Sequence, residues 1–196
     1  MNLAGVVLAG GKSSRYGRPK MFEIYNGKAF YEHSVEAFSE AGICDVFILS
    51  NESLAPAFQT EKAEILVEKE MHKGPLYALY HVLEEQLRGY DWVFLLAADV
   101  PFVSPAFVRS MKTRIVEPSP IQAYIPKSGE KFQPLHGIYH RSCLPVLKEI
   151  INRNKSLSMK ELFQDINVHY VTFAPEEKAF ININRPEEWE NNKEGK

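Results

Sequence analysis

Residues 8–20 read Leu-Ala-Gly-Gly-Lys-Ser-Ser-Arg-Tyr-Gly-Arg-Pro-Lys and follow directly on the apolar run Leu3–Leu8. Three glycines and four cationic side chains lie within the eleven residues from Gly10 to Lys20. Glycines let backbone N–H groups come close to an anion, and lysine and arginine offset the charge of phosphate groups. The segment therefore predicts a phosphate-binding loop at the carboxyl end of a first strand, where open α/β sheets bind their ligands. The alternative is a flexible surface loop.

Two common phosphate-binding motifs do not describe this loop. The G-x-x-x-x-G-K-[ST] pattern of P-loop ATPases is absent, because Gly17 is followed by Arg18 and Pro19. The G-x-G-x-x-G fingerprint of dinucleotide-binding folds is absent as well. Taken by itself, the loop supports binding of a nucleoside triphosphate and chemistry at phosphorus, and it does not indicate the base.

Outward from the loop, short apolar runs alternate with amphipathic stretches, which is typical of strand–helix–strand units. The predicted fold class is α/β: a single Rossmann-like domain with a mainly parallel central sheet covered on both faces. The second half differs, because two of its apolar runs are joined by a polar turn rather than by a helical crossover. We expect strands at 3–8, 46–49, 65–67, 92–98, 121–125, 132–139 and 170–173, and helices at 30–41, 75–87, 104–115, 142–152 and 159–163.

Length and composition limit the class of protein. The chain has 196 residues, of which 45% are hydrophobic, so residues 1–196 can form one domain with a real core, apart from a tail at 191–196 that we expect to be frayed. Lys and Arg number 23 and Asp and Glu 25, which gives a net charge of −2. The absence of a concentrated basic face argues against binding long nucleic acid through its phosphates.

Other features predict a soluble, cytoplasmic protein. Cys44 and Cys143 lie far apart and form no C-x-x-C pair, which fits a reducing compartment. The apolar start of the chain has no basic residue before it, unlike a secretory signal. The longest apolar run, residues 92–98, is far shorter than the roughly 20 residues that cross a bilayer. We therefore expect no membrane partner.

An acidic residue ends the most apolar predicted strand, in the sequence Ala97-Ala98-Asp99-Val100-Pro101. A carboxylate beside such a strand is costly to bury unless something pairs with it. A divalent cation held against substrate phosphates is a suitable partner, since Mg²⁺ is usually bound by one or two carboxylates and completes its shell with phosphate and water. The alternative role is a turn or helix N-cap.

These motifs resemble those of a known superfamily. The pattern L-A-G-G-x-S-x-R-x-G-x-x-K, followed by an apolar strand ending in D-x-P, is similar to nucleotidyltransferases with the nucleotide-diphospho-sugar transferase fold. Residues 74–76 (Gly-Pro-Leu), 133–139 (Gln-Pro-Leu-His-Gly-Ile-Tyr) and 180–188 (Phe-Ile-Asn-Ile-Asn-Arg-Pro-Glu-Glu) extend the likeness over nearly the whole chain. Within the superfamily, the chain most resembles the molybdenum cofactor guanylyltransferase (MobA) family.

The resemblance implies transfer of GMP from GTP to Mo-molybdopterin, with release of pyrophosphate and Mg²⁺ as cofactor. It also implies molybdenum-insertion and molybdoenzyme-maturation proteins as further partners. The implied roles are nucleotide binding for Leu8, Ala9, Gly10 and Gly11, phosphate binding for Lys20, guanine or ribose recognition for Asn51 and Glu68, Mg²⁺ binding for Asp99, and acceptor binding for Asn182 and Asn184. The chain departs from the family pattern at Tyr16, Glu68, Ala78 and Arg185, where the family commonly has Met, Asp, Gly and Thr.

Both reactants are anions, so the main catalytic task is to bring negative charges together and to stabilise charge on the leaving pyrophosphate. Arg15, Lys20 and an Asp99-bound Mg²⁺ suit that task. At the acceptor end, Asn182 and Asn184 alternate with isoleucines, so both amides would face one side of an extended segment. The alternative for Asn184 is to cap a helix that opens at Pro186.

Two other functions stay open at this stage. The first keeps the chemistry with another base or acceptor, as in a cytidylyl-, adenylyl- or sugar-nucleotide transferase. The second is a non-catalytic nucleotide-binding regulator, against which the joint presence of Lys20 and Asp99 argues.

Overall fold

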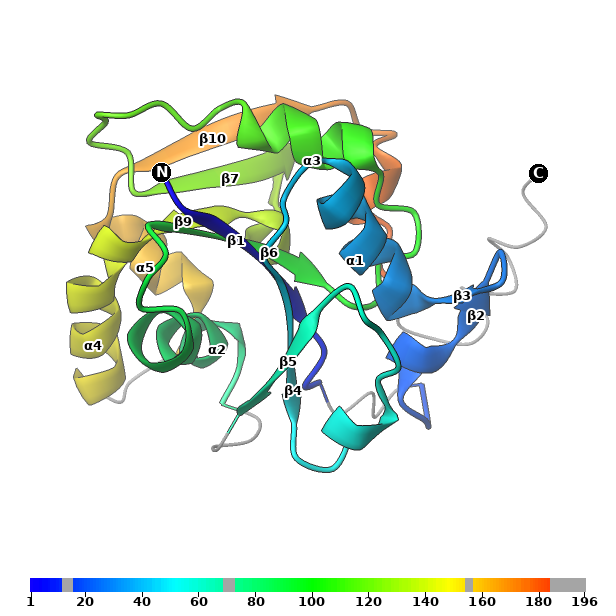
Figure 1. Cartoon of the computed structure of the whole chain (residues 1–196). Helices are drawn as coiled ribbons and strands as arrows, with labels where there is room; N and C mark the ends of the chain where they lie inside the picture. The colour runs from blue at the N-terminus through cyan, green and yellow to red at the C-terminus, as the bar shows by residue number, and fades with distance from the viewer. Residues whose placement is uncertain (12–15, 69–72, 154–156, 184–196) are drawn as a thin grey trace.

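The computed structural model of the chain describes residues 1–11, 16–68, 73–153 and 157–183 (Figure 1). Its strands are β1 (Leu3–Leu8), β2 (Ile24–Tyr25), β3 (Lys28–Ala29), β4 (Val46–Asn51), β5 (Glu64–Glu68), β6 (Trp92–Ala97), β7 (Ala123–Ser128), β8 (Lys131–Phe132), β9 (Ile138–His140) and β10 (Val168–Phe173). Its α-helices are α1 (Phe30–Glu40), α2 (Pro75–His81), α3 (Pro105–Lys112), α4 (Leu144–Arg153) and α5 (Met159–Asp165). Shorter helical turns are η1 (Lys20–Phe22), η2 (Ala55–Ala57), η3 (Val82–Gln86), η4 (Pro134–His136), η5 (Arg141–Cys143) and η6 (Lys178–Phe180).

The central sheet has the strand order β10-β7-β9-β6-β1-β4-β5. Strands β6, β1, β4 and β5 are mutually parallel, and β10 is parallel to β7. Between these two blocks, β9 runs antiparallel to both β6 and β7. The predicted mainly parallel α/β sheet is therefore confirmed.

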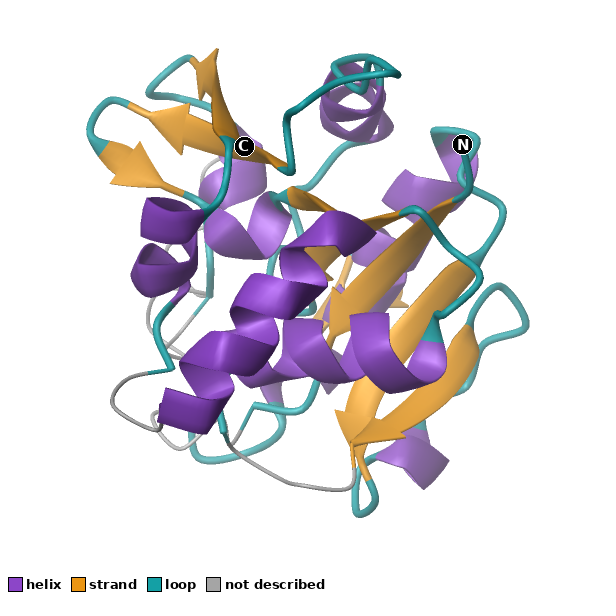
Figure 2. Cartoon of the chain, turned by 90° about the vertical axis from the view of Figure 1, so that its left-hand side faces the viewer, coloured by secondary structure: helices purple, strands orange, loops and turns teal. Residues whose placement is uncertain are grey.

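Helices cover both faces of the sheet, which explains why strands such as β1 and β6 are apolar. Helices α1 and α3 pack against one face, and α2, α4 and α5 pack against the other (Figure 1). Figure 2, seen from the side of α2 and α4, shows helices lying across the strands. All six residues of β6 are buried as a result. None of the helices in the described ranges is long and apolar enough to span a membrane.

The second half differs in detail from the sequence-based expectation. The predicted strand at 132–139 is interrupted, because Pro134, which has no N–H, begins the turn η4 between β8 and β9. The connecting turn is also shorter than predicted, since residues 127 and 128 belong to β7 and 131 to β8. The antiparallel pairing of β7 with β8 confirms the predicted hairpin. Helix α3 ends at Lys112, three residues before the expected end.

His136 is a buried, uncharged group of the core. Its ring meets the rings of Phe107 and Phe180 edge to face, with centroids 6.2 and 5.6 Å away. The Ala179 backbone approaches the ring, but within the described ranges neither ring nitrogen has a hydrogen-bond partner of good geometry. Burial therefore lowers the pKa of His136 from its usual 6.5 to about 4.

This burial predicts a loss of stability in mild acid. The unfolded chain, with its histidine near the usual pKa, takes up a proton before the folded protein does. Stability is complete above about pH 6.5 and should fall as the pH drops toward about 4, by up to about 3 kcal/mol. Urea unfolding at pH 7.0, 5.5 and 4.5 measures the change, and the loss of stability between pH 7.0 and 4.5 should be smaller in His136→Leu by the part that His136 contributes. An identical pH dependence in that variant would contradict the prediction.

Candidate active site

The glycine loop and Asp99 leave neighbouring strands at the same edge of the sheet. Strands β1 and β6 pair in register, with Leu8 opposite Ala97. The pairing continues past the strand ends, because the Ala98 N–H donates to the Leu8 carbonyl at 3.1 Å. Asp99 therefore emerges beside the start of the glycine loop, at the carboxyl edge of the sheet, where ligands bind in such folds.

Lys20, at the far end of the loop segment, returns to this edge and forms an ion pair with Asp99. Both side chains are only 16% exposed. The two residues after Lys20 hold it there, since Met21 is buried and the Phe22 ring packs on Tyr31 and Phe58. The structure thus brings together the two side chains to which the sequence assigns phosphate and metal binding.

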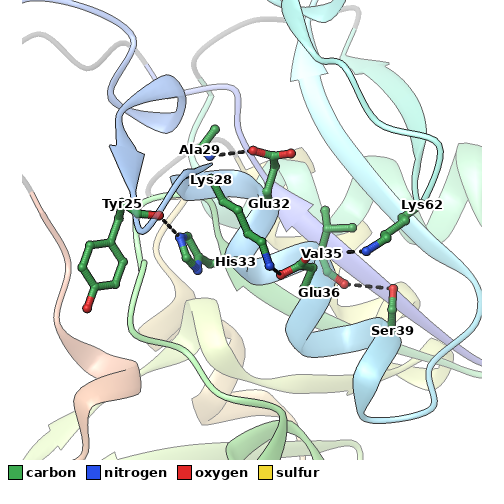
Figure 3. Close-up of polar contacts among 9 residues, drawn as sticks. All are labelled: Tyr25, Lys28, Ala29, Glu32, His33, Val35, Glu36, Ser39 and Lys62. Carbon is green, nitrogen blue, oxygen red and sulfur yellow. Dashed lines mark hydrogen bonds and ion pairs between the residues drawn. The ribbon is translucent and has the colours of Figure 1, made fainter.

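The chain after η1 is tied firmly to helix α1 (Figure 3). The Glu32 carboxylate accepts from the Ala29 N–H at 2.6 Å, and a ring nitrogen of His33 lies 2.9 Å from the Tyr25 carbonyl (Figure 3). Glu36 pairs with Lys28 from the β2–β3 hairpin. These contacts anchor the hairpin, and hence the residues next to Lys20, to a helix that packs on the sheet.

Asn51 and Glu68 end the next two strands and lie opposite each other in the β4–β5 register. A methyl group on Gly10 would come within 2.9 Å of the Glu68 carboxylate, so the Glu68 side chain would have to shift to make room for it. Burial raises the pKa of Glu68, because desolvation disfavours its charged form. A ligand with N–H or O–H donors would compensate that carboxylate.

The Asn51 side chain is buried and is already used by the polypeptide. Its oxygen accepts from the Ser53 hydroxyl at 2.6 Å and from the Leu54 N–H at 3.1 Å. Its amide nitrogen lies 3.5 Å from the Gly10 carbonyl, as a long hydrogen bond. Asn51 is thus next to the glycine loop, and the hydrogen bonds of its side chain go to other residues of the protein.

The segment with Asn182 also reaches this edge. The N–H of Ile183 donates to the Asp99 carbonyl at 3.1 Å, and the Ile183 side chain is buried against Tyr16 and Phe30. The side-chain oxygen of Asn182 is buried and has no hydrogen-bond partner among the residues that the structure describes. A buried polar atom of this kind normally has a partner, so it is suited to a ligand. Arg15 and Asn184 lie outside the described residues.

Sequence reasoning missed two serines that contact the site. Ser50 is fully buried in β4 and donates to the Ala9 carbonyl at 3.2 Å, and Ser34 in α1 donates to the Ala97 carbonyl at 3.0 Å. Both carbonyls lie at the ends of the strands that lead into the site. The available signal for Ser50 was its position as the first polar residue after the apolar run Val46–Leu49.

The fold is that of the nucleotidyltransferases of the nucleotide-diphospho-sugar transferase type. The structure aligns with molybdopterin-guanine dinucleotide biosynthesis protein A from Archaeoglobus fulgidus at a TM-score of 0.74 and 23% identity, over 96% of this chain and 95% of that one. It also aligns with a CMP:2-keto-3-deoxy-manno-octonic acid synthetase complexed with CTP, at a TM-score of 0.72 and 18% identity, over 97% of this chain and 96% of that one. These likenesses show a shared fold.

Sequence comparison identifies the family. A family model described as the MobA-like NTP transferase domain matches residues 5–168, and the chain belongs to this family. It is 35% identical to a probable molybdenum cofactor guanylyltransferase from Geobacillus sp. (strain WCH70), over 96% of each chain. It is 31% identical to a protein with the same description from Halalkalibacterium halodurans, over 94% of each chain.

Proposed function

We propose that the protein transfers GMP from GTP to Mo-molybdopterin and releases pyrophosphate. The observation that carries this proposal is the meeting of the glycine loop, the Lys20–Asp99 pair and the segment that holds Asn182 at one edge of the sheet. The choice of guanine and of the molybdopterin acceptor rests on the guanylyltransferase relatives.

The reaction needs one displacement at phosphorus. A terminal phosphate oxygen of the acceptor attacks the α-phosphorus of GTP, a new P–O bond forms, and the bond to the bridging oxygen breaks as pyrophosphate leaves with the electron pair. Backbone N–H groups of the glycine loop bind phosphate oxygens, and the Lys20 ammonium offsets their charge.

Asp99 is the residue that we propose for Mg²⁺. Its carboxylate supplies the hard oxygen ligand that Mg²⁺ prefers, and a single protein carboxylate suffices because the ion keeps waters and phosphate oxygens. When bound, Mg²⁺ would supply Lewis-acid stabilisation of phosphate charge. Lys20, which pairs with Asp99 in this structure, is close enough to the same charge to share the task.

Glu68 is the residue best placed to recognise the nucleoside through hydrogen bonds. Its carboxylate is half-buried beside Gly10 and accepts hydrogen bonds only, so it suits donors on guanine or ribose. A nucleoside that fills this position without offering donors would leave the carboxylate desolvated and unpaired.

Thermal shifts with GTP, CTP, ATP and UTP test the assignment of the base. A ligand stabilises the folded state by RT ln(1 + [L]/Kd), so GTP with Mg²⁺ should raise the melting temperature most. Chromatography of a reaction with Mo-molybdopterin should then show the guanine dinucleotide together with pyrophosphate. An equal or larger shift with CTP would support a cytidylyltransferase instead, and absence of pyrophosphate with any acceptor would support a regulator.

Asn182→Ala tests the acceptor end. We expect GTP affinity to be unchanged. The KM for Mo-molybdopterin should rise by about tenfold, because this factor corresponds to the free energy of one hydrogen bond to a buried polar group. Asn167→Ala is the matched control, because Asn167 donates to the Pro120 carbonyl at 3.2 Å on an exposed part of the surface. Lower stability with normal turnover per folded molecule would show that Asn182 is only a structural contact.

A further inference from the structure

Two consecutive carbonyls at the start of the glycine loop turn toward the same neighbouring strand. The Ala9 carbonyl accepts from the Ser50 hydroxyl at 3.2 Å, and the Gly10 carbonyl is 3.5 Å from the Asn51 amide nitrogen. Ser50 and Asn51 are the last two residues of β4. In a regular strand, successive carbonyls point to opposite sides, so the chain leaves strand geometry at Gly10.

The direction of these carbonyls fixes the direction of the next two N–H groups. Because a trans peptide is planar, the N–H of each residue points opposite to the carbonyl before it. The N–H groups of Gly10 and Gly11 therefore both point away from β4. On the other side of β1 lies β6, from which Asp99 follows. Successive N–H groups on one side form a concavity that binds anions.

The orientation of the Asn51 amide is set in turn by the residues after it. Its oxygen accepts from Ser53 and from the Leu54 N–H, which leaves the NH₂ group to face Gly10. An amide turned the other way would set its oxygen against the Gly10 carbonyl oxygen. Ser53 thus helps to determine which end of the amide meets the loop.

We propose that Ser50, Asn51 and Ser53 are positioning residues that aim the Gly10 and Gly11 N–H groups at the nucleotide phosphates. This inference rests on the proposed nucleotidyltransferase function, and it assigns Asn51 to the loop rather than to the base. Loss of a positioning contact should weaken binding of the phosphates and leave binding of the nucleoside unchanged.

The test compares GTP with guanosine, which has no phosphate. We expect Ser50→Ala and Ser53→Ala to raise the Kd and KM for GTP by about 3- to 10-fold, the range for loss of one hydrogen bond, with the inhibition constant of guanosine within twofold of wild type. Ser53→Thr keeps the hydroxyl and should restore GTP binding. Ser39→Ala is the matched control, because its hydroxyl donates to the Val35 carbonyl at 3.1 Å within α1 (Figure 3).

The outcomes separate the possible roles. Equal weakening of GTP and guanosine would overturn the inference in favour of base recognition, and GTP binding equal to that of Ser39→Ala would overturn it in favour of a structural role. Failure of the guanine assignment would appear in the wild type as preference for another triphosphate. The same comparison, made with that triphosphate and its nucleoside, would still decide the positioning role.

Discussion

Asp99→Asn should lower the rate of nucleotidyl transfer by about 100- to 1,000-fold, the range for removing a preorganised electrostatic group from a transition state. The amide keeps the size of the side chain and removes its negative charge, so the proposed ligand of Mg²⁺ is lost while the packing around it is retained. The fold should survive, because the backbone of Asp99 still accepts from the Ile183 N–H.

Two measurements separate a metal role from a structural one. Pyrophosphate release gives the rate, and calorimetric titration with GTP, with and without Mg²⁺, gives the contribution of the ion to binding. That contribution should disappear in Asp99→Asn. Asp91→Asn is the matched control: Asp91 precedes β6 at the opposite end and accepts from the Asn2 N–H at 2.8 Å. Unchanged Mg²⁺-dependent pyrophosphate release in Asp99→Asn would refute the metal role.

The parallel core of the fold could be predicted from the sequence, and the reason is burial. Strands such as β1 and β6 are covered on both faces, so they appear as short apolar runs that need no knowledge of their neighbours. The second half could not be predicted as well. There, the single predicted strand at 132–139 is divided between β8 and β9. The break between them at η4 depends on Pro134 and on the Gln133 N–H, which donates to the Pro126 carbonyl at 2.9 Å.

The candidate site shows a similar division. The loop and Asp99 could be placed at one edge because each directly follows a predicted strand. The closeness of Glu68 to Gly10 depends on the strand order β1-β4-β5, which no local pattern contains. The direction of the Asn51 amide depends on a hydroxyl two residues later in a turn. Side-chain type predicted which residues gather at the site, and only the tertiary structure shows which of their atoms contact other parts of the protein.

Lys20→Ala should lower turnover by about 100-fold or more. A preorganised donor at a reacting phosphate contributes about 3–4 kcal/mol to transition-state stabilisation, whereas an exposed ion pair contributes less than about 1 kcal/mol to folding. Lys20 is only 16% exposed, so its pair with Asp99 is not an exposed ion pair, and we expect Lys20 to act as a preorganised donor of this kind. The loss should therefore appear in the rate more than in stability.

Lys62→Ala provides the comparison for Lys20→Ala, because Lys62 is 62% exposed and pairs with Glu36 at 3.3 Å, away from the site (Figure 3). Its turnover should stay within twofold of wild type. Lys20→Arg keeps the charge and should recover only part of the rate, since a planar guanidinium does not reproduce the compact ammonium. A decrease of less than threefold in Lys20→Ala would mean that Lys20 does not stabilise the transition state, and the charge stabilisation would then have to come from other residues of the loop.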